Sequence, residues 1–163
     1  MESTIFSPSL ELLMKQDVRE ATALFGRLLW CEAARLGLKN IFVSGDIDSA
    51  DGGIDAKAER VDGSGRHSFF YQIKAGASFK PWQPAAISKE LFASAIGRPS
   101  KKRLGSAVRR CLDTRGTYIL VVPGHDLLAE NHSKSISLLR SAFAACGYPK
   151  ARVEVWEYGS LRT

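Results

Sequence analysis

Cysteine is scarce in this chain, and its three cysteines lie far apart. Cys31, Cys111 and Cys146 form no pair at the short spacing of a zinc-binding motif, and an odd number cannot all pair in internal disulfides. We therefore expect small buried cysteines in a reducing compartment, the cytoplasm. Their number and spacing argue against a disulfide-stapled secreted domain and against a cysteine-based zinc module.

Long apolar runs are also absent from the sequence. No stretch approaches the roughly 20 consecutive apolar residues of a membrane-spanning helix. The first residues, MEST, lack the basic and apolar regions of a signal peptide. We therefore expect a cytoplasmic protein with no membrane partner.

Acidic residues are outnumbered by basic ones, 17 against 23, which gives a net charge of +6. This balance favours an anionic partner such as nucleic acid. Hydrophobic residues make up 45% and charged residues 25% of the 163 residues, as in a globular chain with a packed core. We find no internal repeat and no low-complexity linker, so we expect a single domain over residues 1–163.

Hydrophobic periodicity and turn residues predict alternating helices and strands. A continuous apolar run at 117–123 is typical of a central strand that helices cover on both faces. The whole order predicts an α/β fold with a mixed central sheet flanked by helices. The expected elements are a helical region at 10–35, strands at 40–44, 54–61 and 68–75, helices at 85–96 and 105–113, a strand at 117–123, a helix at 130–146 and a strand at 152–158.

The most informative stretch is the hairpin that we expect around the turn-forming residues 62–67. Antiparallel pairing across this turn sets Asp55 opposite Lys74. Side chains alternate along a strand, so Gln72 and Lys74 share one face, and Asp55 joins them there. A carboxylate, an amide and an ammonium thus converge on one patch, unless the register slips by one residue.

These three residue types suit metal-assisted hydrolysis of a phosphodiester. Asp55 is a hard oxygen ligand for Mg²⁺ or Mn²⁺, and Gln72 can add its amide oxygen or orient a bound water. Lys74 can stabilise charge on the phosphate or help to deprotonate the attacking water. The alternative interpretation is structural, because Asp-Gly-Gly is a common turn and a Gln-x-Lys strand can simply have one solvated face.

The segment DGGID at 51–55, followed by QIK at 72–74, resembles the PD-(D/E)XK nuclease superfamily, and within it the Mrr type. In that variant an aspartate follows a glycine-rich turn and Gln-x-Lys lies on the next strand; Ile54 stands where the namesake proline would be. The resemblance covers residues 20–76. It implies a restriction-endonuclease-like core, a Mg²⁺- or Mn²⁺-dependent DNA endonuclease, and metal ligands at Asp55, Gln72 and Asp51.

The superfamily often takes a further acid from its first helix. Glu32 lies on the amphipathic face of the first predicted helix and is a candidate catalytic residue; alternatively, it pairs with Arg35 or Lys39. The Mrr pattern has a Phe-Glu pair in this helix, but the phenylalanine here precedes Gly26. Either Glu32 or Glu20 supplies the acid, or the site lacks it.

The densest basic cluster and the helix after it hold the candidate nucleic-acid-binding residues. Contacts from such residues to phosphates are independent of base sequence and sensitive to salt. A solvated basic surface is the ordinary alternative. The candidates are Arg98, Lys101, Lys102, Arg103, Arg109 and Arg110.

Together these patterns predict a metal-dependent DNA endonuclease with Asp55, Gln72, Lys74 and Glu32 as catalytic residues. The resemblance suggests an effector in restriction or antiphage defence, the N-terminal module of a longer protein. Double-strand cutting would favour a homodimer or a larger assembly. One rival is a nuclease fold that no longer cuts and that binds nucleic acid or mediates assembly. Another is an enzyme or scaffold unrelated to nucleic acid.

Overall fold

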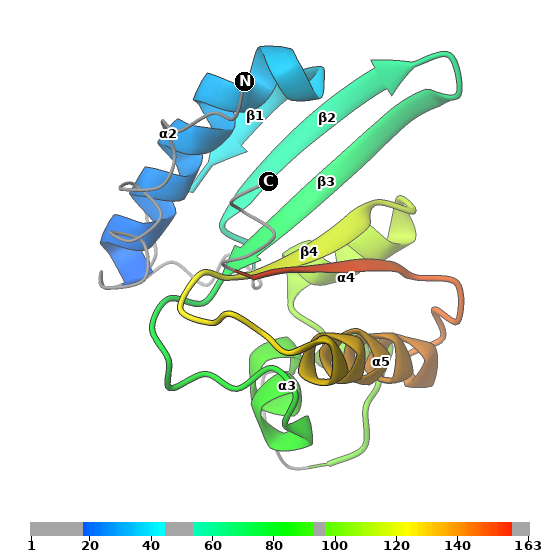
Figure 1. Cartoon of the computed structure of the whole chain (residues 1–163). Helices are drawn as coiled ribbons and strands as arrows, with labels where there is room; N and C mark the ends of the chain where they lie inside the picture. Colours follow the sequence, from blue (N-terminus) through cyan, green and yellow to red (C-terminus); the bar gives the residue numbers. More distant parts are fainter. Residues whose placement is uncertain (1–17, 45–53, 93–96, 158–163) are drawn as a thin grey trace.

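The computed structural model describes residues 18–44, 54–92 and 97–157. Over these ranges the chain forms a five-stranded mixed sheet with helices on both faces (Figure 1). The predicted order of helices and strands is confirmed. The helices are α2 (Val18–Leu36), α3 (Pro84–Leu91), α4 (Ser106–Asp113) and α5 (Ala129–Ala145), with the short 3-10 helix η1 (Lys101–Arg103). The strands are β1 (Leu38–Val43), β2 (Ala56–Asp62), β3 (Gly65–Ile73), β4 (Thr117–Val122) and β5 (Arg152–Glu157).

The strands lie across the sheet in chain order, β1-β2-β3-β4-β5. β1, β2 and β3 pair antiparallel, whereas β3 pairs parallel with β4 and β4 pairs parallel with β5. A parallel step needs a crossover long enough to bring the chain back to the same end of the sheet. α3 and α4 lie in the first crossover and α5 lies in the second.

β4 shows why the sheet needs helices on both faces. All six of its residues are buried, as its apolar run predicts. Tyr118 and Leu120 belong to the core under α3, α4 and α5. Ile119 and Val121 point the other way and belong to the core under α2. Among the helices in the described ranges, none is long and apolar enough to cross a membrane.

The β2–β3 hairpin has a tighter turn than the sequence predicts. β2 extends to Asp62 and β3 begins at Gly65, so only two residues close the turn, which is the commonest hairpin connection. The Asp62 carboxylate accepts the backbone N–H of Ser64 at 2.9 Å. Hydrogen bonds from Ser64 lower the pKa of Asp62 to about 2. Because these contacts close the turn early, residues 66 and 67 are extended and not part of the loop.

The register of the hairpin differs from the predicted one by two residues. Ala56 pairs with Tyr71 in the last pair of the ladder, and Asp55, just before β2, donates its backbone N–H to the carbonyl of Tyr71 at 2.8 Å and does not pair with Lys74. A shift of two residues returns each side chain to the same face of the sheet, whereas a shift of one would reverse it. The paired residues of the ladder therefore keep their faces. Asp55 lies outside the ladder, where the alternation is interrupted, because Ile54 belongs to the core under α3, α4 and α5 whereas Ala56 belongs to the core under α2.

The three cysteines are free, and two of them are buried as expected, but Cys31 is exposed. α2 buries Ala21, Phe25 and Leu29 against the sheet. Cys31 follows Leu29 by two residues, which turns it about 200° away around the helix axis. The expectation of a buried Cys31 was therefore wrong.

Candidate active site

Asp55, Gln72 and Lys74 lie where β3 ends. Gln72 is the penultimate residue of β3 and pairs with Leu120, which belongs to the core under α3, α4 and α5. Lys74 continues the parallel ladder, since its backbone N–H donates to Val121 at 2.9 Å. Asp55 donates its backbone N–H to Tyr71 at 2.8 Å. The hairpin therefore brings the predicted carboxylate and the Gln-x-Lys strand together at one corner of the sheet.

The Asp55 side chain is oriented by the backbone of β3. Its Oδ2 accepts the N–H of Ile73 at 2.7 Å. Its own carbonyl accepts the N–H of Ser44, at the end of β1, at 2.8 Å. A hydrogen bond from a backbone N–H to a carboxylate favours the ionised form and fixes its direction. Asp55 is thus held as an oriented, half-buried anion between β1 and β3.

The amide of Gln72 is only 3% exposed, and both of its ends are engaged. The hydroxyl of Tyr118 donates to Gln72 Oε1, and Gln72 Nε2 donates to Glu90 Oε1. A buried amide needs such partners, and a hydroxyl donor on one side with a carboxylate acceptor on the other defines which end is oxygen. The side chain is therefore fixed in one orientation.

Glu90 joins Gln72 to Lys74. Its second oxygen, Oε2, lies 2.7 Å from Lys74 Nζ, and the two side chains are 16% and 29% exposed. Glu90 was not among the residues predicted for the site, although its position in the sequence carries a signal. Ile87 and Leu91 form the buried stripe of α3, and Glu90 lies three residues after Ile87 on that same side. A carboxylate on a buried stripe is unfavourable without a partner, and here the partners are Gln72 and Lys74.

Tyr118 forms the back of this network. Burial raises the pKa of its phenol well above the ordinary value, and the negative charges of Glu90 and Asp55 raise it further. Both carboxylates therefore act on the same buried hydroxyl. The phenol stays protonated at neutral pH and remains a donor to Gln72.

Glu32 is not brought to this corner. It pairs with Arg35 on its own helix, which is the structural alternative for this residue. α2 packs on the face of the sheet opposite to Gln72. Glu32 also lies eleven residues after Ala21, or about 16 Å along the helix axis. Glu20, the other candidate, is exposed in the first turn of α2.

The oxygen donors at this corner fit a hard divalent cation. Within the described ranges, no three acidic, histidine or cysteine side chains gather as a metal centre. Two carboxylates, Asp55 and Glu90, and the amide oxygen of Gln72 are present. Mg²⁺ is commonly held by one or two carboxylates and keeps several of its waters, so this set suits Mg²⁺ or Mn²⁺. Asp51, the other predicted ligand, lies outside the described residues.

The predicted basic cluster divides into side chains with and without local partners. Lys101 lies 2.8 Å from Asp113 and covers the ring of Tyr148 at 5.1 Å. Arg103 lies over the ring of Phe92 at 5.3 Å. The pKa of Lys101 is raised, chiefly by its hydrogen bond to Asp113. Lys101 and Arg103 therefore hold the connection before α4 in place.

The remaining members of the cluster are open to solvent to different degrees. Arg98, Lys102 and Arg110 are exposed, and Arg109 is half-buried. Arg110 lines a cavity of about 310 Å³ whose lining includes neither Asp55 nor Gln72.

In comparisons with protein-family models, curated proteins and solved structures, none matched this chain.

Proposed function

We propose that the chain is a metal-dependent endonuclease that hydrolyses phosphodiester bonds in DNA. The main support is the convergence of Asp55, Gln72 and Lys74, together with Glu90, at the end of β3. The order of elements and the hairpin that bears the motif agree with the restriction-endonuclease-like core that the Mrr-type resemblance implies. A role in restriction or antiphage defence follows from the same resemblance.

In this proposal Asp55 and Gln72 hold Mg²⁺ or Mn²⁺, and Glu90 adds a further carboxylate. When bound, such a cation lowers the pKa of a coordinated water and offsets charge on the phosphate. Tyr118 orients the amide of Gln72, and the backbone N–H of Ile73 orients the carboxylate of Asp55, so both side chains are already ordered before a cation binds. Preorganised groups of this kind avoid the cost of ordering side chains during binding.

Lys74 has a separate role. Its ammonium is partly exposed and is fixed at the site by Glu90. A positive charge held beside the carboxylates can stabilise the negative charge that grows on the scissile phosphate. The side chains of Asp55, Glu90 and Lys74 sum to one negative charge, which favours the entry of a divalent cation.

One observation favours a second candidate function. Glu90 already engages Gln72 and Lys74, and the described part of the first helix supplies no acid to the corner that they form. A nuclease fold that binds nucleic acid without cutting, or that mediates assembly, would keep these contacts and would need no metal. The two functions differ in whether cleavage occurs.

Cleavage of supercoiled plasmid DNA in Mg²⁺, in Mn²⁺ and in EDTA tests the proposal. Wild type is compared with Asp55→Ala and Lys74→Ala. Glu130→Ala and Lys134→Ala are the matched controls, because they remove the same charges from exposed positions on α5. We expect metal-dependent nicking or linearisation by wild type and controls, and its loss in both site variants. Equal cleavage by all five proteins would refute the assignment of the site. Salt-sensitive DNA binding without cleavage would favour the second function.

A further inference from the structure

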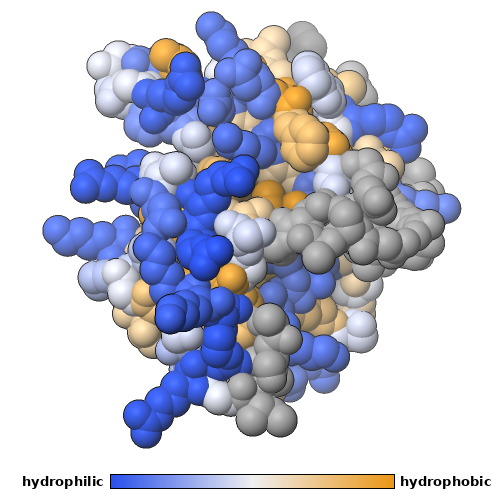
Figure 2. Space-filling view, turned by 180° about the vertical axis from the view of Figure 1, so that it is seen from behind, coloured by the Kyte–Doolittle hydropathy of each residue, from blue (hydrophilic) through white to orange (hydrophobic). Residues whose placement is uncertain are grey.

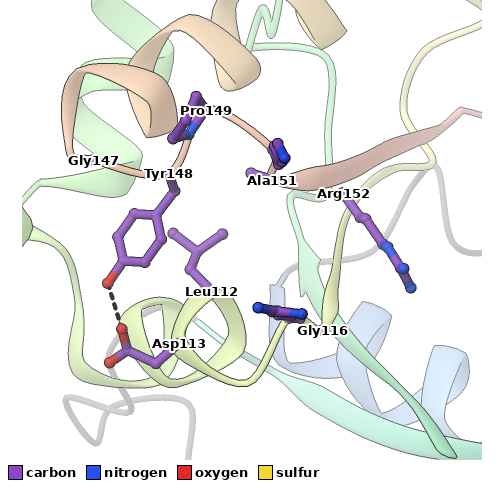
Figure 3. A pocket seen from close by; sticks show the side chains of 10 residues that line it. Leu112, Asp113, Gly116, Gly147, Tyr148, Pro149, Ala151 and Arg152 are labelled. Atoms are coloured by element: carbon purple, nitrogen blue, oxygen red, sulfur yellow. Dashed lines mark hydrogen bonds between the residues drawn. The ribbon is translucent and has the colours of Figure 1, made fainter.

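Two adjoining cavities lie at the end of the sheet where β4 and β5 begin. One, of about 480 Å³, lies between the last turn of α4 and the loop before β5 (Figure 3). The other, of about 310 Å³, lies between the same turn and the β2–β3 hairpin. Arg115 and Arg152 line both cavities. Thr117, in the second cavity, precedes Val121 by four residues, so about 13 Å along β4 separate it from the backbone partner of Lys74.

Basic side chains outnumber acidic ones in the lining of both cavities. They come from the hairpin, from the end of α4 and from the start of β5. Figure 2 shows hydrophilic residues gathered on the side of the molecule where Figure 1 places the hairpin tip and α4. The basic lining residues are Lys57, Arg66, Arg110, Arg115, Lys150 and Arg152.

The two carboxylates in the lining are already engaged. Glu59 accepts Asn40 Nδ2 at 2.7 Å and lies 3.7 Å from Lys57 and 3.9 Å from Arg66. The hydrogen bond from Asn40 is the largest cause of its lowered pKa. Asp113 accepts the hydroxyl of Tyr148 at 2.7 Å (Figure 3) and pairs with a lysine. Neither carboxylate therefore neutralises the positive charge of Arg110, Arg115 or Arg152.

Three guanidinium groups remain available to a ligand. Arg110, Arg115 and Arg152 are exposed, and no salt bridge within the described part of the chain engages them. A guanidinium presents a planar set of donors that matches the oxygens of a phosphate. The cavities therefore offer phosphate-binding groups without internal competitors.

Arg115 occupies a backbone position that favours glycine. Its φ is +55°, and it ends α4 with hydrogen bonds from Arg115 N to Leu112 O at 3.1 Å and from Gly116 N to Cys111 O at 2.8 Å. Glycine is usual at this left-handed position after a helix, because a side chain there strains the backbone. From this position Arg115 presents its side chain between the two cavities, where a glycine would strain the backbone less.

The turn that presents Arg115 is packed firmly on the hairpin. A Cβ at Gly116 would lie 2.8 Å from the side chain of Phe70, which lines the second cavity. Lys57 Nζ lies over the ring of Phe70 at 5.2 Å. The floor of the cavity, the ammonium of Lys57 and the backbone turn that bears Arg115 are thus placed by contacts that do not depend on a ligand.

We propose that these two cavities form one surface that binds the phosphates of a nucleic-acid backbone. The cations belong to three separate elements and extend over both cavities, which fits a row of phosphates better than one small anion. The identity of the ligand rests on the proposed function, but its binding does not require cleavage. Of the basic residues that the sequence singles out for nucleic acid, only Arg110 lies on this surface.

The test uses fluorescence anisotropy to measure the affinity for a labelled DNA duplex, in EDTA and at several salt concentrations. Arg115→Gly removes the guanidinium and relieves the left-handed strain, so we expect weaker binding with unchanged or higher thermal stability. Arg152→Gln removes a second cation. Each variant should lower the slope of log affinity against log salt by about one. Arg140→Gln, exposed on α5, is the control and should leave both affinity and slope unchanged.

Three results would overturn the proposal. The first is failure of the wild type to bind DNA. The second is wild-type affinity and slope in both Arg115→Gly and Arg152→Gln. The third is inorganic phosphate binding that both variants weaken while DNA binding is unaffected, which would make the surface a small-anion site. Wild-type binding through these arginines without metal-dependent cleavage would support the surface and refute only the nuclease function.

Discussion

Tyr118→Phe removes one oxygen from the network behind Gln72. Tyr118 is 0% exposed and its hydroxyl donates to Gln72 Oε1, while Gln72 is itself almost fully buried. The variant keeps the ring, which packs edge-on against Phe143 at 5.3 Å between centroids. Its main effect is therefore to leave a buried amide oxygen without its donor.

The expected size of this effect follows from burial. Loss of one partner from a buried hydrogen bond costs about 1–3 kcal/mol. In a chain of this length, a loss of about 2 kcal/mol lowers the melting temperature by about 4–8 °C. Because Gln72 then keeps only its bond to Glu90 and loses the donor that fixes its oxygen, we also expect slower cleavage by the variant under the proposed function.

Tyr71→Phe is the matched control. Tyr71 is as deeply buried, but it lies on the opposite face of the sheet, and no hydrogen bond of its hydroxyl occurs in the described part of the chain. We expect this variant to stay within about 0.5 kcal/mol of wild type, since no buried hydrogen bond is lost. Urea unfolding, monitored by circular dichroism, measures the free energy of unfolding of both variants. Equal stability of the two variants would refute the proposed link between Tyr118 and Gln72.

Three further predictions concern packing and protonation. Gly124→Ala would place a Cβ 2.3 Å from the carbonyl oxygen of Gly76, just after Lys74. We expect the free energy of unfolding, measured by thermal unfolding, to fall by about 1–3 kcal/mol. Gly63→Ala is the control and should be neutral, because no atom lies within 4 Å of its added Cβ. Exposed Cys31 should react with a thiol reagent in the native protein before the two buried cysteines do, and simultaneous reaction of all three would contradict the fold. Burial raises the pKa of Cys111 from 9.0 to about 12, so the unfolded chain loses this proton first. The free energy of unfolding should then fall by about 1.4 kcal/mol per pH unit above pH 9, and a Cys111→Ala variant with the same slope would contradict this cause.

The fold could be predicted from the sequence largely because its elements are periodic and separated by clear turn residues. The apolar run of β4 predicts its burial on both faces, and the structure confirms it. The end of the turn after Asp62 was harder to predict, because residues 62–67 are rich in turn formers. Ser64 bonds back to the Asp62 carboxylate, and this contact decides where β3 begins.

The candidate site was predictable only in its strand residues. Gln72 and Lys74 share a face through the alternation of strand positions, whereas Asp55 is brought to β3 by its backbone hydrogen bond to Tyr71 and by the N–H of Ile73 on its carboxylate. The helical members of the site depend on which face of the sheet each helix covers, and an amphipathic pattern does not contain that information. For this reason Glu32 was selected from the helix on the wrong face, and Glu90, which reaches Gln72 across 18 residues, was missed.

Under the proposed function, Asp55 belongs to a divalent-cation site at the end of β3. Titration of the protein with Mn²⁺ and with Mg²⁺ in a calorimeter tests it directly, and needs neither a substrate nor an activating partner. We expect a saturable binding event in wild type that is lost in Asp55→Asn and retained in Asp113→Asn, an acid far from Gln72. No binding by wild type, or equal binding by wild type and Asp55→Asn, would contradict the claim.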